Sequence, residues 1–294
     1  QAGISARPLP KLSLLANLRY EDRDDKTPVV DYFPVTTGTT FTGENEPRSI
    51  KTTNGKVEAG YALPHEFRVT GGVDYEEKKR NFSAVRVVSA REQTEETAYR
   101  LGVRRPLGET VTGSFTFIHS NRTGSDFLTT TLTTGASGSN LIAPLHLADR
   151  DRDKVRLALD WSPLEALSFQ LSAERADDDY SARTAQNLGP RAGKAENYAL
   201  DATYVFSETL QANAWVSYND NRIDQTTCEN ASGAGVCPAN AADPIWQANL
   251  RSSGDAIGLG ARGKPSKRID LGADLEYFRF RDEFGQQAIT AGAT

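Results

Sequence analysis

The sequence contains no methionine and only two cysteines among its 294 residues. It also lacks any run approaching the ~20 consecutive apolar residues that a transmembrane helix needs, and its mean hydropathy is −0.53. The formal net charge of −5 excludes a general nucleic-acid-binding protein, because such a protein needs a basic surface. A membrane β-barrel is not excluded, because only alternate residues of its strands face lipid and the apolar signal is diluted by half.

The two cysteines, Cys228 and Cys237, lie close together in the segment CENASGAGVC. We expect them to form a disulfide within an extracellular loop, in an oxidising compartment. Two unpaired thiols in a flexible loop are the alternative. A metal site is disfavoured because no histidine lies nearby in the sequence.

Strict alternation of apolar and polar residues is the dominant pattern of the chain. In KVRLALDWSPLEALSFQLSAE (154–174), Val155, Leu157, Leu159 and Trp161 alternate with polar residues, and the alternation resumes at Leu167 after a short break. A period of two over about ten residues predicts a β-strand with one apolar face. About eleven segments share this pattern, and no convincing amphipathic helix is present: 12–20, 57–63, 67–75, 99–103, 111–117, 155–161, 167–173, 198–206, 210–218, 257–261 and 269–277.

The connections between these segments alternate between short and long. The short ones carry Pro, Gly and Ser, which favour tight turns: 64–66, 106–109, 162–166, 207–209 and 264–268. The long ones are polar: 24–49, 78–92, 123–149, 181–195 and 225–247. This asymmetry is typical of outer-membrane barrels, in which short turns face the periplasm and long loops the exterior.

Aromatic residues cluster next to both kinds of connection. Tyr20, Tyr75, Tyr218 and Tyr277 lie at the long-loop ends, and Tyr61, Trp161, Tyr204 and Phe206 lie at the short-turn ends. Two membrane interfaces select such girdles. The general enrichment of aromatic residues in strands explains their number but not their repeated position.

The opposite face of the predicted strands carries charges of both signs. A soluble β-sandwich would expose such a face to water, whereas in a barrel it lines a wet lumen. Trp215 and Phe278 are apolar exceptions, expected either to pack locally or to contact something inside. The polar set is Arg68, Asp74, Arg100, Arg104, Lys154, Arg156, Asp160, Gln170, Glu174, Asp201, Asn213, Asp270, Asp274 and Glu276.

The sequence therefore predicts an all-β, antiparallel, up-and-down transmembrane β-barrel, with residues 1–294 forming one segment and no separate soluble domain. About eleven is an odd number, whereas bacterial single-chain barrels close with an even number. The chain also lacks a start residue, a signal segment and an aromatic final strand. We therefore expect a partial barrel from a longer protein.

Three segments resemble the MtrB/PioB family of decahaem-associated outer-membrane proteins: LRYEDRDDKTP (18–28), RDRDKVRLALDWSPLEALSFQLSAERADDDY (150–180) and YALDATYVFSETLQANAWVSYNDN (198–221). In that family a large barrel of the bacterial outer membrane sheathes a periplasmic multi-haem c-type cytochrome. The resemblance implies extracellular electron transfer, in metal reduction or iron oxidation, with the cytochrome inside the barrel and in some systems a second, extracellular one. It also implies contact with outer-membrane lipid and lipopolysaccharide. The chain departs from the family in being shorter and in lacking a Cys-x-x-Cys near its start.

The chain carries no chemistry of its own that points to an enzyme. It has no Cys-x-x-Cys-His, so haem would be carried by the partner. It has no Gly-x-Ser-x-Gly, and Asp177-Asp178-Asp179 has no evident histidine partner for acid-based proteolysis. The three histidines, His65, His119 and His146, are scattered, as isolated surface histidines are.

Three acidic clusters are candidates for Ca²⁺ at the loops, or for Ca²⁺ bridging to lipopolysaccharide phosphates. We favour the alternative, that they are solvated charge runs. The clusters are Asp22/Asp24/Asp25, Asp149/Asp151/Asp153 and Asp177 to Asp179.

Two functions fit this pattern. The first is a sheath for a cytochrome. The second is a diffusion porin or transport barrel, which the same alternation and loop asymmetry would serve. The double girdle weighs against a soluble or adhesive β-protein.

Overall fold

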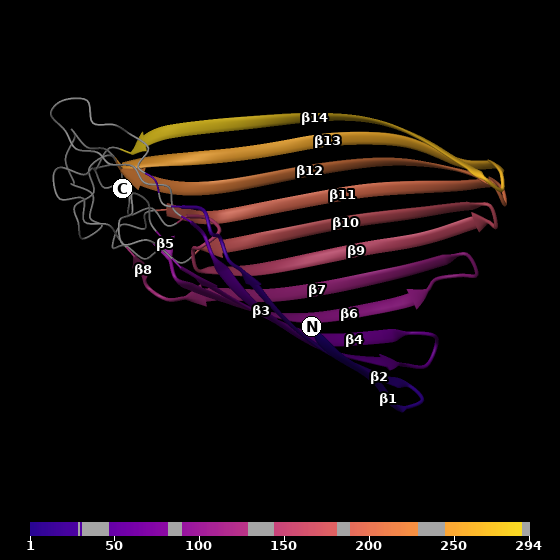
Figure 1. Cartoon of the computed structure of the whole chain (residues 1–294), viewed down its shortest axis with the longest axis horizontal. Helices are drawn as coiled ribbons and strands as arrows, with labels where there is room; N and C mark the ends of the chain where they lie inside the picture. Colours follow the sequence, from indigo (N-terminus) through magenta and orange to yellow (C-terminus); the bar gives the residue numbers. More distant parts are fainter. Residues whose placement is uncertain are drawn as a thin grey trace.

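The computed structural model describes residues 1–28, 30, 47–81, 90–128, 144–180, 189–228 and 245–289. Twelve of its strands form one antiparallel sheet in the order β1-β2-β3-β4-β6-β7-β9-β10-β11-β12-β13-β14, and β5 pairs with β8 in a second, two-stranded sheet. Figure 1 shows the long strands lying side by side. Within the described part there is no helix long and apolar enough to cross a membrane. The strands are β1 Ala2–Leu9, β2 Leu12–Arg23, β3 Ile50–Ala62, β4 Arg68–Arg80, β5 Ala90–Arg91, β6 Gln93–Pro106, β7 Val111–Gly124, β8 Phe127–Leu128, β9 Arg150–Leu164, β10 Leu167–Tyr180, β11 Gly189–Ser207, β12 Leu210–Cys228, β13 Ile245–Ser266 and β14 Ile269–Ile289.

The order of the large sheet confirms the predicted all-β, up-and-down architecture, because each long strand pairs with the next one along the chain. The sheet has twelve strands rather than about eleven, and the additional one is β1. Its residues Ala2, Ile4 and Ala6 alternate, but Pro8 breaks the pattern. Proline is tolerated there because β1 is an edge strand, which among the described strands pairs with β2 alone.

The predicted alternation of short turns and long connections is confirmed, with tighter turns than expected. The turn after β9 consists of Glu165 and Ala166 alone, and that after β13 of Lys267 and Arg268. At the turn after β3, His65 and Glu66 have φ values of 59° and 62°. Two consecutive left-handed residues match the twist of a tight hairpin.

The apolar residues of the twelve strands form one continuous face. Across seven neighbouring strands, register places apolar residues or glycine directly opposite one another: Gly113, Leu159, Leu171, Leu200, Val216, Ile257 and Tyr277. These side chains are not buried within the protein, since Leu157 is 52% exposed and Leu259 54%. The buried hydrophobic residues of the described part are only Leu147, Ala148, Ala176, Tyr180 and Ala248. The described residues do not cover this apolar face, and membrane hydrocarbon is the surrounding that suits it.

Aromatic rings border the apolar face at both ends of the strands. Near the short turns, Trp161 stacks on Phe169 at 5.2 Å and Tyr204 meets Phe206 edge-on at 4.6 Å. Near the long connections, Tyr198 stacks on Tyr218 at 6.3 Å. The two predicted girdles thus lie on the same face as the apolar belt.

The strands continue past the aromatic girdle that lies near the long connections, and there their outward face becomes charged. On β10 the outward positions after Ala173 are Arg175, Asp177 and Asp179, and Arg175 pairs with Asp177 at 2.9 Å. The strands are longer there than we predicted. Both of their faces are polar in this region, so the sequence shows no alternation of apolar and polar residues.

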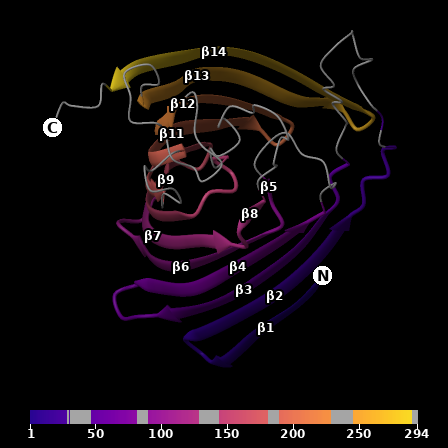
Figure 2. The same cartoon turned by 90° about the vertical axis from the view of Figure 1, so that its left-hand side faces the viewer.

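The sheet curves into an open trough (Figure 2). Its edge strands β1 and β14 do not pair with each other among the described residues. Because twelve is an even number, the odd strand count no longer argues for a partial barrel.

Candidate functional site: the polar inner face

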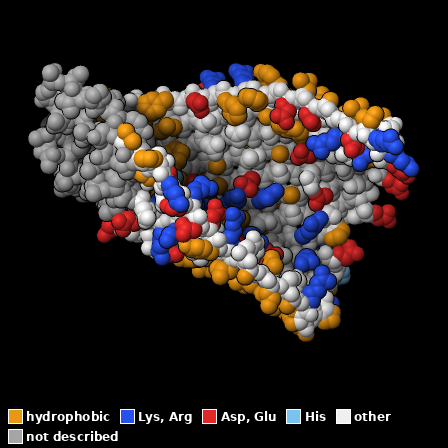
Figure 3. All heavy atoms as spheres, viewed as in Figure 1, with side chains coloured by type: hydrophobic (Ala, Val, Ile, Leu, Met, Phe, Trp, Pro, Cys, Tyr) orange, Lys and Arg blue, Asp and Glu red, His pale blue; other side chains and the backbone are white. Residues whose placement is uncertain are grey.

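The concave face of the trough is polar. Figure 3 looks into this hollow, where Lys, Arg, Asp and Glu side chains gather and hydrophobic ones lie along the borders. Register confirms that the predicted polar residues share this inner face: Arg156 lies opposite Glu174, and Asp160 opposite Gln170, which in turn lies opposite Asp201. The period of two puts charge on one face and apolar side chains on the other.

Cross-strand ion pairs bind the inner face into a lattice. Arg152 of β9 donates two hydrogen bonds to Asp178 of β10 at 2.5 and 2.7 Å. Arg100 of β6 reaches Glu58 of β3 at 3.0 Å and Asp74 of β4 at 3.2 Å, and so ties three strands together. Three further pairs repeat the arrangement: Arg150–Glu96 at 2.8 Å, Lys154–Glu174 at 2.9 Å and Arg104–Asp160 at 3.3 Å.

The charges of the inner face are unevenly distributed around the trough. On β2 to β10, which we name the basic sector, thirteen inner residues are basic and eight are acidic. The basic residues are Arg19, Arg23, Lys56, Arg68, Lys78, Arg80, Arg100, Arg104, Arg122, Arg150, Arg152, Lys154 and Arg156. The acidic residues are Glu21, Glu58, Asp74, Glu76, Glu96, Asp160, Glu174 and Asp178.

On β11 to β14, which we name the acidic sector, the balance is reversed. Besides the turn-end pair Lys264–Asp270 at 3.3 Å, one inner residue is basic, Arg262. The acidic ones are Asp201, Asp274, Glu276 and Asp282.

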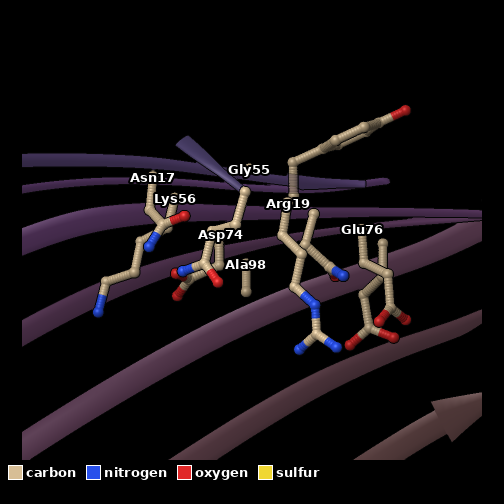
Figure 4. A pocket seen from close by; sticks show the side chains of 11 residues that line it. Asn17, Arg19, Gly55, Lys56, Asp74, Glu76 and Ala98 are labelled. Carbon is tan, nitrogen blue, oxygen red and sulfur yellow. The ribbon is translucent and has the colours of Figure 1, made fainter. Parts of the chain in front are cut away.

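A polar cleft of about 610 Å³ lies on the inner face of the basic sector. Figure 4 shows Arg19 from β2, Lys56 from β3, and Asp74 and Glu76 from β4 pointing to the same side of the ribbon. The mixed charges suit a hydrated polar surface or solute more than an apolar ligand.

Aromatic side chains interrupt the polar inner face in the acidic sector. Trp215 lies so close over Gly258 that an added Cβ there would overlap its indole ring. Phe280 covers Gly254 in the same manner, with a ring atom 2.8 Å from where a Cβ would stand. Trp215 is therefore packed locally, one of the two predicted possibilities. Phe278, by contrast, is 62% exposed.

A segment of the β7–β9 connection folds inward and packs on the inner face. Arg91 is fully buried, and its guanidinium donates hydrogen bonds to the backbone oxygens of Ser125 (2.6 Å) and Leu147 (2.8 Å). It also pairs with Asp149 at 2.6 Å. Arg122 donates to the backbone oxygens of Ala148 and Leu145 at 2.9 and 2.8 Å. Figure 2 shows the β5–β8 pair inside the curve of the sheet, so this region narrows the hollow at its long-loop end.

No sequence pattern predicted that this segment between β7 and β9 folds onto the inner face. Arg91 lies in a region that we predicted as a loop, and its partners are far along the chain. The exposed rings of Phe280 and Phe284 on the inner face were also missed, although they lie two and six residues after Phe278, and these even spacings in a strand could have revealed them.

The histidines and carboxylates of the described residues form no group of three that could hold a metal ion. His119 Nδ1 lies 2.8 Å from Asp153 on the outward face of the sheet. His65 lies in a turn. Burial, together with Arg80, Arg122 and Arg48, lowers the pKa of His146. Ca²⁺ at the acidic clusters, which we considered but did not favour, therefore stays a hypothesis without a ligand set among the described residues.

The acidic clusters instead engage neighbouring donors. Asp25 accepts hydrogen bonds from Thr27 Oγ1 at 2.6 Å and from the backbone N–H groups of Thr27 and Arg48 at 3.0 and 2.9 Å. These bonds lower its pKa to about 2. The predicted disulfide of Cys228 with Cys237 falls outside the described residues, because Cys237 is not among them.

A curved antiparallel sheet with an exposed apolar belt, two aromatic girdles and a charged concave face defines an outer-membrane β-barrel protein. The family model for the outer membrane beta-barrel porin MtrB/PioB matches residues 1–291, and the chain belongs to this family. It is 26% identical over 274 residues to outer membrane protein MtrB of Shewanella baltica (strain OS185). That match covers 90% of this chain and 36% of the relative, so the chain spans about a third of the relative's length.

Two solved structures align with most of this chain at TM-scores below 0.5. The alcaligin outer-membrane receptor FauA of Bordetella pertussis aligns at a TM-score of 0.46 and 9% identity, over 95% of this chain and 52% of that one. The structure of the FpvAI–pyocin S2 complex aligns at a TM-score of 0.42 and 12% identity, over 96% of this chain and 49% of that one.

Proposed function

We propose that this chain forms the wall of an outer-membrane barrel that encloses a multi-haem c-type cytochrome and positions it for electron transfer across the membrane. The observation that carries the proposal is the inner face: a broad, curved, polar surface with charges of both signs. Such a surface suits a folded soluble protein, which makes polar and water-mediated contacts at its rim. The apolar belt keeps that polar occupant away from hydrocarbon.

The redox chemistry in this proposal belongs to the occupant. The chain has no Cys-x-x-Cys-His motif, so electrons would pass through haems of the partner. The wall supplies insulation, orientation and a path through the lipid. A second cytochrome at the long-loop end would complete transfer to an external donor or acceptor.

The alternative is a diffusion porin or transport barrel, and the cleft of about 610 Å³ with its polar and charged lining residues favours it. The discriminating experiment purifies the native protein from its outer membrane and tests for a haem protein that remains bound. Vesicles containing the purified complex should then reduce an enclosed acceptor from an external donor. If the vesicles conduct ions but transfer no electrons, even with the haem protein present, the proposed cytochrome sheath is wrong and the porin is favoured.

A further inference from the structure

Among the described residues, the inner ion-pair lattice leaves one cation of the basic sector without a partner, and in the acidic sector it leaves four carboxylates and one cation, Arg262, without partners. On β9, Arg156 makes no ion pair or side-chain hydrogen bond with any described residue, because Glu174 opposite it bonds to Lys154 instead. In the acidic sector, Asp201, Asp274, Glu276 and Asp282 likewise make none within the described ranges. The residues around the trough therefore do not neutralise one another fully.

The curvature of the sheet makes this separation of charge directional. Figure 2 shows β13 and β14 along one side of the hollow and β2 to β4 along the other. The acidic sector thus faces the basic sector across the hollow. Charged walls around a space of restricted water act on an occupant more strongly than the same charges in bulk solvent.

The acidic sector also presents exposed phenyl rings. Phe278, Phe280 and Phe284 are 62%, 65% and 62% exposed on the inner face, and Phe278 lies 5.7 Å from Phe280. Hydrated ions and small polar solutes gain little from such rings. A protein surface gains from them, because aromatic residues surrounded by polar groups are typical of protein–protein contacts.

We propose that the inner face fixes the rotational orientation of an enclosed protein: its acidic side lies against β2 to β10, and a basic, partly apolar side lies against β11 to β14. This inference rests on the proposed function and adds the chemistry of the contact to it. Electrostatic complementarity sets orientation and excludes wrong partners more than it adds raw affinity.

Photo-crosslinking from the two sectors tests the orientation. Arg156 and Glu276 are each replaced, in separate variants of the native protein in its membrane, by p-benzoylphenylalanine. The crosslinked peptides of the haem protein should be acidic from position 156 and basic from position 276. Leu157, which faces outward, is the matched control and should crosslink to lipid alone.

Charge reversal provides a second readout. Asp274→Lys combined with Glu276→Lys should lower the co-purified haem about tenfold at moderate salt, whereas Asp255→Lys, on the outward face of β13, should leave it unchanged. If the unaltered protein retains no haem protein, the proposed function fails. If it retains one, but position 276 yields acidic peptides or peptides from the same side as position 156, only the orientation is overturned. An unaffected haem content in the double variant would overturn it too.

Discussion

At the residue scale, the inner face depends on glycines that large rings cover. Gly258 lies beneath the indole of Trp215, with no room for a Cβ. Gly258→Ala should displace the ring and lower the free energy of unfolding by about 1–3 kcal/mol, the usual cost of overpacking. Urea unfolding of the protein in detergent or bilayers, followed by tryptophan fluorescence, measures the change.

Gly71→Ala is the matched control, because an added Cβ there meets no atom within 4 Å. It should leave stability unchanged or raise it by about 0.5 kcal/mol, since alanine loses less backbone entropy in a strand. Equal destabilisation by both substitutions would show that Trp215 does not pack on Gly258 as described.

Asp25 gives a second prediction at this scale. Its pKa is lowered to about 2 from 3.8, first by the hydroxyl of Thr27 and then by the backbone N–H groups of Arg48 and Thr27. The pKa of this carboxyl is lower in the folded protein than in the unfolded chain. Its ionised form therefore stabilises the fold fully above pH 3.8, and this stabilisation is lost as the pH falls through about 2. The carboxyl ¹³C signal of Asp25 should titrate near pH 2, and Thr27→Ala should raise that midpoint. A midpoint near 4 in the unaltered protein would contradict the described bonds.

At the element scale, the inward-folded segment between β7 and β9 depends on Arg91. Its guanidinium is completely buried and joins Ser125, Leu147 and Asp149. Removing one member of a buried pair costs roughly 3–5 kcal/mol, because the other charge remains desolvated. Arg91→Met should therefore release residues 144–149, which hydrogen–deuterium exchange would detect as faster amide exchange there, with β6 and β7 unchanged.

Arg175→Met is the control for this substitution. Arg175 and Asp177 are 55% and 56% exposed on the outward side, so the loss of their pair should change stability by less than about 1 kcal/mol. If Arg91→Met left exchange in 144–149 unaltered, the segment would be held by something other than this cluster.

The strands themselves were largely predictable, because a half-exposed strand repeats every two residues and the lipid-facing set is apolar throughout. The prediction failed where that contrast disappears. Pro8 concealed β1, and charged residues on both faces concealed the long-loop ends of strands such as β11, which begins at Gly189 rather than near Tyr198.

The sequence predicted which residues lie on the inner face, but not which of them contact one another. Alternation places Arg100 and Glu58 on the inner side, but their bond joins residues 42 positions apart. Such pairing follows from strand register, which no local pattern specifies. The Arg91 cluster is harder still, because it joins three segments of the loops and depends on a backbone fold without periodicity.

At the scale of the whole molecule, the sheet is stable only between two different media. Its outward belt exposes leucine, valine and tyrosine side chains, and its inner face carries arginine, lysine and carboxylates. Among the described residues, neither face encloses more than a few buried apolar side chains, so most of the apolar stabilisation of folding must come from contact with lipid. The two faces should therefore respond oppositely to the same substitution.

Leu159 and Ala158 provide this test, because they are adjacent in β9 but point to opposite faces. Leu159 lies between Gly113 and Leu171 within the apolar belt, and Ala158 lies between Ser114 and Ser172 on the inner face. Leu159→Arg should cost about 2–4 kcal/mol when the protein folds into a bilayer, as charges at mid-membrane do in other barrels. Ala158→Arg should cost much less, since the new guanidinium meets water and polar neighbours. Folding free energies in lipid vesicles measure both. A larger loss of folding free energy for Ala158→Arg than for Leu159→Arg would mean that the concave face, not the convex one, faces apolar surroundings. Both the cytochrome sheath and the porin would then be contradicted.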